Sequence, residues 1–136
     1  MRAKILVVED NAMNMELATD LLETQGYQVL QATAVPEARE ILRARTPDLI
    51  LLDIQLPGVD GLALAEELQN DPRTKGIPIV ALTAHAMKGD EEKARKAGCR
   101  TYIAKPIEMH AFLATVAQHL TLARAAANGE PREAAA

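Results

Sequence analysis

Acidic, hydroxyl and lysine side chains directly follow four short apolar runs of this chain. They are Glu9 and Asp10, Asp53, Thr83, and Lys105. Asp53 closes the most hydrophobic run, Leu49-Ile50-Leu51-Leu52, which is too short to span a membrane and is typical of a strand buried on both faces of a parallel sheet. A carboxylate at the end of a buried strand costs free energy unless it is paired or binds a metal. Asp53 is therefore the first residue to consider for chemistry.

The carboxyl ends of parallel strands meet at one edge of a sheet, and ligands bind there. Three carboxylates at such an edge repel one another unless a cation lies among them, and a hard ion such as Mg²⁺ meets that need with oxygen ligands. Lys105 adds positive charge, and Thr83 adds a hydroxyl donor. Such a set can stabilise a phosphoryl group in transfer, and a carboxylate can itself be the nucleophile.

Each of these residues also has an ordinary structural interpretation. Asp53 could be a helix cap or an ion-pair partner, and Glu9-Asp10 could be favourable charge at a helix N-terminus. Thr83 could end a strand because of its β-propensity, and Lys105 could be a solvated surface lysine. Their occurrence at the same ends of successive strands favours a shared site over these separate interpretations.

Apolar runs and helical patterns alternate five times along the chain. Strands are expected at 5–8, 27–32, 49–52, 79–82 and 102–104. Helices are expected after Asn11, from Pro36, from Asp60, around 90–97, and across Ile107 to Leu120. Asn11 can cap the first helix, while Gly26 and Gly98 can end the first and fourth. The fourth helix has only Ala94 and Ala97 as apolar residues. Strict alternation with short connections predicts an α/β fold, in which helices cover both faces of a parallel sheet.

The composition restricts the classes of protein to which the chain can belong. With 136 residues, 49% hydrophobic and 25% charged, it fits one globular domain. We expect that domain at 1–122 and a partly helical or disordered tail at 123–136, because the tail has no large apolar residue. A net charge of −4 disfavours nucleic-acid binding, and no apolar stretch approaches the roughly 20 residues of a membrane helix. The single cysteine, Cys99, suits the cytoplasm.

Four stretches of the chain together resemble the receiver domain of two-component response regulators. They are Val7–Asn11, Leu52–Gly61, Ala81–Ala84 and Ala104–Pro106, within a resemblance that runs from about Ala3 to Leu120. Within that family, Asn11–Asn14 and Thr83–Asp90 are most similar to the single-domain cell-cycle regulators of the DivK type. Receivers attached to hybrid histidine kinases share much of this pattern, so a receiver excised from such a kinase is the alternative. The tail favours a stand-alone protein.

The resemblance implies a flavodoxin-like doubly wound sheet of five strands, in the order 2-1-3-4-5, with five helices. It implies that Asp53 accepts a phosphoryl group from a histidine kinase or histidine phosphotransferase. Mg²⁺ would be held by Asp10, Asp53 and the backbone carbonyl of Gln55, and by Glu9 through water. Glu9 stands where many members of the family carry Asp.

The resemblance also assigns the response to phosphorylation. Thr83 would hydrogen-bond the phosphoryl oxygens, Lys105 would form an ion pair with them, and Tyr102 would rotate after Thr83. The Lys105-Pro106 bond would be cis. The surface of the fourth helix, fifth strand and fifth helix would then bind a downstream protein. Beyond self-catalysed phosphoryl acceptance and slow autodephosphorylation, no enzymatic activity is expected.

Two other functions stay open from the residues. A Mg²⁺-dependent phosphatase with an aspartyl nucleophile is one, although that class usually places a second Asp two residues after the nucleophile, where this chain has Gln55. A scaffold with a vestigial site, which acts without phosphorylation, is the other.

Overall fold

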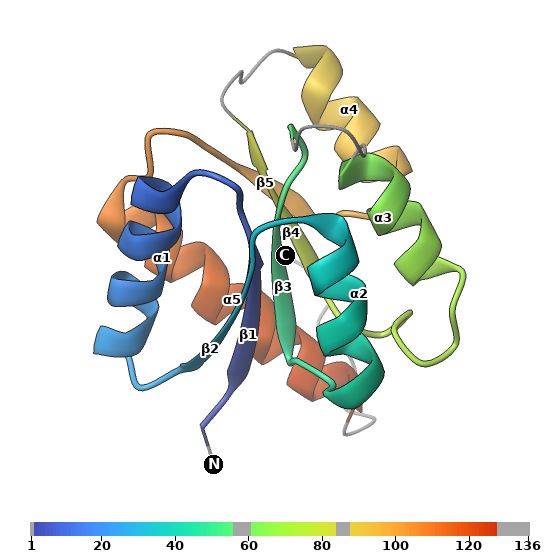
Figure 1. Cartoon of the computed structure of the whole chain (residues 1–136), viewed down its shortest axis with the longest axis horizontal. Coiled ribbons are helices and arrows are strands. Elements are labelled where there is room, and N and C mark those ends of the chain that lie inside the picture. Colours follow the sequence, from blue (N-terminus) through green and yellow to red (C-terminus); the bar gives the residue numbers. More distant parts are fainter. Residues whose placement is uncertain (1, 56–60, 84–87, 128–136) are drawn as a thin grey trace.

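Strands and helices alternate along the whole described part of the chain (Figure 1). The structure is a computed structural model, and it describes residues 2–55, 61–83 and 88–127. The strands are β1 (Lys4–Val8), β2 (Gln28–Ala32), β3 (Leu49–Asp53), β4 (Ile79–Thr83) and β5 (Thr101–Ala104). The helices are α1 (Ala12–Thr24), α2 (Val35–Ala44), α3 (Gly61–Gln69), α4 (Lys88–Lys96) and α5 (Met109–Ala127).

The five strands form one parallel sheet in the order β2-β1-β3-β4-β5. This confirms the predicted fold class and strand order. Strand β3 lies in the middle, and all five of its residues are buried, as expected of a continuous apolar run. The strand order places the carboxyl ends of β1, β3, β4 and β5 next to one another along one edge of the sheet.

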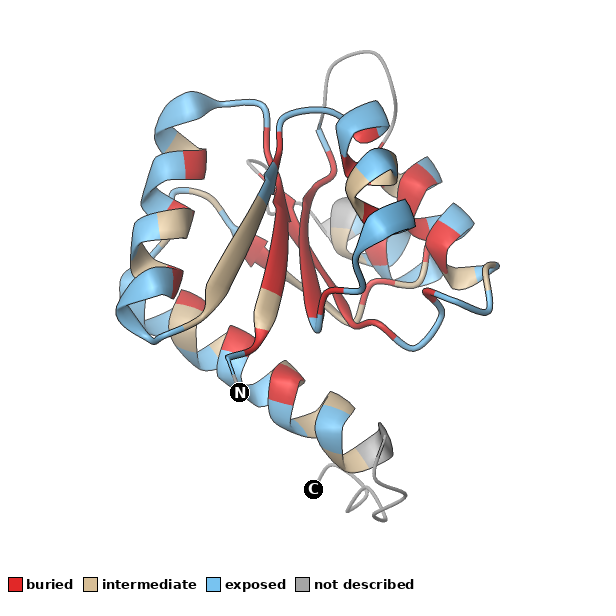
Figure 2. Ribbon diagram, turned by 60° about the horizontal axis from the view of Figure 1, so that its bottom comes forward, coloured by how far each residue is buried: buried red, intermediate tan, exposed pale blue. Residues whose placement is uncertain are grey.

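Alternating residues of the central strands pack on opposite faces of the sheet. Ile5, Val7, Leu49 and Leu51 join the cluster that includes Phe112 and the inner residues of α1 and α5. The intervening positions of the same strands join the cluster formed with α2, α3 and the region of α4, namely Leu6, Val8, Ile50 and Leu52. Figure 2 shows these buried residues concentrated in the central strands and on the inner sides of the helices. Two helix layers therefore enclose the sheet.

Local signals in the sequence set several helix ends. The Asn11 side chain accepts a hydrogen bond from the Asn14 amide at 3.0 Å, which confirms it as the N-cap of α1. Gly26 and Gly98 have φ of 84° and 106°, a conformation that disfavours residues with a Cβ atom. Ala94 and Ala97 are buried, as predicted for the narrow apolar side of the fourth helix.

The last helix differs in its bounds from the expected one. It begins at Met109, after Ile107, and continues through Leu122 to Ala127. The division of the chain at 122 stays a prediction, and residues 128–136 lie outside the described part. Within the described residues, no helix is both long enough and apolar enough to span a bilayer.

Candidate functional site

Three of the predicted site residues are buried at the carboxyl edge of the sheet. Glu9 follows β1 and is 1% exposed, Asp53 ends β3 and is 2% exposed, and Thr83 ends β4 and is 1% exposed. Asp10 is exposed beside them. Buried carboxylates need partners, since an isolated charge in the protein interior is strongly unfavourable. The contacts of Glu9 and Asp53 therefore define the site.

Lys105 supplies the positive charge that both buried carboxylates need. It follows β5, and its side chain is only 13% exposed. Its Nζ lies 2.6 Å from Glu9 Oε1 and 2.9 Å from Asp53 Oδ2. The ammonium thus reaches from the end of the edge strand β5 and bridges the ends of β1 and β3. Lys105 and Asp53 therefore lie in direct contact at the edge of the sheet where the sequence placed both, and the pairing of Lys105 with a phosphoryl group stays a prediction.

The network changes how readily its members gain or lose a proton. Burial raises the pKa of Glu9, and the contact with Lys105 and the hydrogen bond from the Asn11 amide offset this only in part. Burial opposes the charge of Lys105, but its bonds to Glu9 and Asp53 outweigh that effect and raise the pKa of Lys105. The lysine is therefore held as a cation in the site.

Backbone groups hold the second oxygen of each buried carboxylate. The Gln55 amide donates to Asp53 Oδ1 at 2.8 Å, and the Asn11 amide donates to Glu9 Oε2 at 3.1 Å. Both carboxylates are thus fixed between a main-chain donor and Lys105. Gln55 is exposed, and it contacts Asp53 through its backbone amide. The part played by its carbonyl in metal binding stays a prediction.

Gly61 allows the start of α3 to pack directly on the end of β3. A Cβ atom at this position would lie 2.5 Å from the Asp53 carbonyl oxygen and 2.8 Å from Ile54 Cα, both backbone atoms. No flexible side chain could move aside to relieve this contact. The absence of a side chain at Gly61 therefore helps to set the backbone position of Asp53.

Glu9, Asp10 and Asp53 form an acidic cluster that can hold a cation. One carboxylate oxygen from each residue lies within 4.8 Å of the others. Glu9 Oε1 is buried, and apart from its ion pair with Lys105 it makes no hydrogen bond of regular geometry. Oxygen ligands of this kind suit a hard divalent ion. The residues present therefore fit the Mg²⁺ that the sequence predicts.

Thr83 and Tyr102 lie on the side of the sheet that faces α2, α3 and α4. Thr83 shares its face of β4 with Ala81, since side chains alternate along a strand. Tyr102 packs against the same apolar cluster. The carbonyl of Thr83 accepts a hydrogen bond from the Lys105 amide at 2.8 Å. The Lys105-Pro106 bond is cis, as the resemblance implied.

Among the cavities of the described surface, one borders this site and a larger one lies away from it. One of about 340 Å³ is bordered by Glu9, Asp10 and residues of α1. A larger one, of about 690 Å³, lies between α1, β2 and α2 and includes none of the predicted site residues. The larger cavity therefore does not coincide with the predicted site, which is marked instead by its buried charged residues.

Sequence reasoning missed the direct contact between Glu9 and Lys105. It assigned Glu9 to the metal through water and Lys105 to the phosphoryl group. The two residues are far apart in the chain, so no local pattern links them. The sequence offered one signal of this contact: both side chains are long, and both follow strands that end at the same edge of the sheet.

Comparisons with known proteins agree with this architecture. The family profile described as the response regulator receiver domain matches residues 5–117. The polar-differentiation response regulator DivK of Brucella ovis is 45% identical over 120 residues, which cover 88% of this chain and 98% of that relative.

Two solved structures have the same fold. A CheY-like receiver domain protein from Methanospirillum hungatei has a TM-score of 0.84 and 25% identity, and the match covers 91% of this chain and 98% of that one. The receiver domain of a signal transduction histidine kinase from Syntrophus aciditrophicus has a TM-score of 0.80 and 31% identity, with coverage of 88% and 90%. The chain therefore belongs to the response regulator receiver domain family.

Proposed function

We propose that Asp53 accepts a phosphoryl group from a phosphohistidine of a histidine kinase or histidine phosphotransferase. The observation that carries this proposal is the environment of Asp53. Its carboxylate is buried, fixed by the Gln55 amide and by Lys105, and belongs to a cluster of three carboxylates. These contacts orient one carboxylate as a nucleophile beside a positive charge, as phosphoryl transfer requires.

The reaction forms one bond and breaks one. A carboxylate oxygen of Asp53 attacks the phosphorus, and an oxygen–phosphorus bond replaces the phosphorus–nitrogen bond of the phosphohistidine. The donor imidazole leaves with the electron pair of that bond and is protonated. Lys105 offsets negative charge on the transferred group, and the Thr83 hydroxyl provides a further donor.

Asp10, Asp53 and the carbonyl of Gln55 would hold Mg²⁺ at this site directly, and Glu9 would hold it through water. When bound, the ion would neutralise charge on the phosphoryl oxygens. Without positive charge, the phosphoryl group and three carboxylates would repel one another, and Lys105 alone does not balance them. Phosphoryl acceptance should therefore require a divalent ion.

Phosphorylation would act as a switch because it changes the charge beside Thr83 and Lys105. It adds roughly −1.5 to −2 charges and new acceptor oxygens. We infer that Thr83 moves toward the phosphoryl group, that Tyr102 follows, and that α4 shifts. Among the side chains of α4 that the structure describes, Ala94 is the one buried in the core, so a shift should cost little. The surface of α4, β5 and α5 would then bind a downstream protein.

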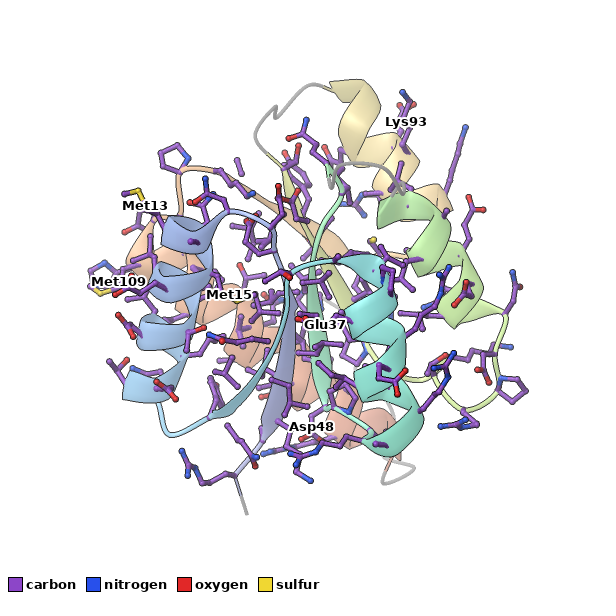
Figure 3. The ribbon with its side chains drawn as sticks, viewed as in Figure 1. Met13, Met15, Glu37, Asp48, Lys93 and Met109 are labelled. Atoms are coloured by element: carbon purple, nitrogen blue, oxygen red, sulfur yellow. The ribbon has the colours of Figure 1, made fainter. Side chains whose placement is uncertain are left out.

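A protein donor is favoured by the apolar surface next to the site. Within the described residues, the large hydrophobic side chains that are exposed are Met13 at 80%, Leu17 at 41% and Met109 at 45%. Met13 and Leu17 lie one turn apart on α1, and Met109 begins α5 on the same side of the molecule (Figure 3). Exposed apolar groups gathered in this way mark a protein interaction surface. We therefore place the docking of the phosphodonor over the starts of α1 and α5.

The similarity to DivK favours a single-domain regulator over a receiver excised from a hybrid kinase, because the match covers 98% of DivK. The phosphatase alternative has less support, since Gln55 stands where that class carries its acid/base. We propose that the protein does no catalysis beyond its own phosphorylation and slow dephosphorylation. We place it in the cytoplasm, which suits its single, buried thiol, Cys99.

A small acyl phosphate with Mg²⁺ tests the assignment of Asp53. Intact-protein mass spectrometry should show the addition of one phosphoryl group that is labile in base. Asp53→Asn should abolish it, while Asp20→Asn, which changes an exposed carboxylate of α1, should not. An unchanged mass in the wild type would favour the vestigial scaffold. Undiminished labelling of Asp53→Asn would show that another residue accepts the group.

A further inference from the structure

Strand β2 is an edge of the sheet, and its outer side is open. It lies between α1 and α2, and within the described part of the chain it pairs with β1 alone (Figure 1). The Gln28 amide donates to the carbonyl that precedes β1 at 2.8 Å, and the Ala32 carbonyl accepts from the amide that follows β1 at 3.0 Å. Backbone groups of successive residues in a strand point to opposite sides, so those of Val29 and Gln31 point away from β1. Their two amides and two carbonyls are therefore available to a further strand.

The open stretch of this edge is short and has defined ends. The Tyr27 amide already donates to the Leu22 carbonyl at 3.3 Å, and the Thr33 amide donates to Glu37 Oε1 at 2.8 Å. Proteins commonly protect an edge strand with lysine, proline or a bulge, and β2 contains neither lysine nor proline. An edge without these features can accept an added strand.

Both neighbouring helices border this edge, so β2 lies at the base of a groove of about 690 Å³. Thr19 and Glu23 line the groove from α1, and Ile41 and Ala44 line it from α2. A second copy of this chain would carry its own α1 and α2 beside the same edge, and these helices would collide with those of the first copy. A single extended segment has no flanking helices, so it is the occupant that fits the groove.

The two walls of the groove differ in chemistry. On the α2 side, Leu30 and Ile41 pack against the same apolar cluster, Ala44 lies beside them, and Glu40 and Arg45 carry opposite charges. Helix α1 has no basic residue. Its exposed carboxylates along this groove, and along the adjoining cavity of about 340 Å³ that shares Thr19 and Gln31 with it, are Glu16, Asp20 and Glu23. Because side chains alternate along a strand, an added segment would present one set of side chains to an apolar wall and the other set to an acidic wall.

We propose that the outer edge of β2 binds an extended segment of a partner protein in which basic side chains alternate with aliphatic ones. The segment adds a strand to the sheet and exchanges hydrogen bonds with the backbone of Val29 and Gln31. Its aliphatic side chains lie against α2 and its basic side chains against α1. This surface is separate from the one over the starts of α1 and α5 that we assign to the phosphodonor, and binding here does not require phosphorylation of Asp53.

Amide exchange measured by NMR on the whole, unphosphorylated chain tests the proposal. The probe is a short synthetic peptide of alternating lysine and valine with blocked ends. In the free protein, the amides of Val29 and Gln31 should exchange faster than those of Leu30 and Ala32, which face β1. With the peptide bound, exchange at Val29 and Gln31 should slow about tenfold or more, because both amides then donate to the added strand.

Two methylated peptides test the hydrogen bonds from the side of the probe. One carries a methyl group on the backbone nitrogen of every lysine, and the other carries it on that of every valine, so their charges are equal. Only alternate amides of an added strand face β2, so one of these peptides should lose affinity about tenfold or more and the other should lose less. If both bind as tightly as the unmethylated peptide, the proposal is wrong.

Three variants of the protein test the walls and the edge. Glu23→Lys should weaken binding about fivefold or more, whereas Glu66→Lys, which makes the same change of charge on the exposed side of α3, should stay within about twofold of the wild type. Gln31→Pro removes an outward donor and no hydrogen bond to β1, and it should weaken binding about fivefold. If Gln31→Pro does not fold, the methylated peptides examine the same hydrogen bonds.

Three results would overturn the proposal. The first is unchanged exchange at Val29 and Gln31 at the highest soluble concentration of the peptide. The second is equal weakening by Glu23→Lys and Glu66→Lys, because the peptide would then respond only to the total charge of the protein. The third is protection of Val29 and Gln31 that rises with protein concentration in the absence of the peptide, because a second copy would then occupy the edge.

Discussion

At the scale of single residues, the site depends on charges that the fold has removed from water. Glu9 and Asp53 are almost fully buried, and Lys105 is largely so. Removing one partner of such a network leaves the others unpaired in the interior, which costs more than the loss of one surface ion pair. Thr83 differs from these residues because it carries no charge. Substitution of Thr83 can therefore separate the effect on partner binding from the effect on phosphorylation of Asp53.

Thr83→Ala tests that separation. Phosphorylation of Asp53 should stay largely intact, because Thr83 is neither the nucleophile nor a carboxylate of the acidic cluster. The increase in partner affinity on phosphorylation should fall about tenfold, the effect of losing one hydrogen bond to a charged group. Calorimetric titration of a downstream partner with both forms of the protein measures this increase. An equal increase in the variant and the wild type would contradict the role of Thr83, and Thr83→Ser should retain it.

At the scale of elements, the end of β3 is placed by its contact with α3. Gly61 lies against the backbone of Asp53 and Ile54, so we expect a small shift of the helix start to move Asp53. Gly76 follows α3 in the chain, and a Cβ atom there would meet no atom within 4 Å. The two glycines thus form a matched pair, one in a close contact and one in open space.

Gly61→Ala should lower the free energy of unfolding by about 1–3 kcal/mol, because the added methyl group overlaps backbone atoms. It should also slow phosphorylation of Asp53 by a small acyl phosphate. Gly76→Ala should leave both quantities near their wild-type values. Urea unfolding and the rate of mass increase measure the two effects. A Gly61→Ala protein as stable as Gly76→Ala would show that α3 can move away without cost.

Helix α5 carries a group that makes stability depend on pH. Burial of His119, and next the charge of Arg100, lower the pKa of this histidine below 6.5. As the pH falls through 6.5, the unfolded chain therefore binds a proton at His119 before the folded protein does, and the free energy of unfolding decreases. Urea unfolding at pH 7.5 and pH 5.5 should show a smaller loss in His119→Gln than in the wild type. An identical loss in both proteins would contradict this prediction.

At the scale of the whole molecule, the exposed apolar side chains lie where a large donor can approach the site. Met13, Leu17 and Met109 come from α1 and α5, which cover the same face of the sheet. A partner docked there would contact the helix starts beside Asp10 and Asn11. A small phosphodonor needs no such surface. The two kinds of donor should therefore respond differently to substitutions in this region.

Met13→Ser should slow phosphoryl transfer from a phosphorylated histidine phosphotransferase about five- to tenfold, the loss expected for one buried contact of an interface. The rate with a small acyl phosphate should be unchanged. Ala44→Ser on α2, which covers the other face of the sheet, should affect neither rate. Gel-based transfer assays with both donors give the comparison. Equal slowing with both donors would mean that Met13 acts on the site and not on docking.

Much of this protein could be predicted from the order of residues alone. The alternation of apolar runs with helical patterns fixed the class of fold, since each pattern reflects local chain geometry. Asn11 and Gly26 acted at the ends of α1 as their conformational preferences predict. Glu9, Asp53, Thr83 and Lys105 were placed at one edge because strands of a parallel sheet end there together. The strand order and the cis bond came from the resemblance to a family.

Only the tertiary structure decided which of these groups touch. Glu9 reaches Lys105 across the ends of two intervening strands, and Asp53 takes a hydrogen bond from the Gln55 amide. Side chains alternate along a strand, so Thr83 belongs to the face of the sheet that includes Ala81, and Asp53 belongs to the opposite face, which includes Leu51. Local propensity carries no information on such contacts. They depend on strand order, on the relative register of the strands and on side-chain length, which act together only once the sheet has formed.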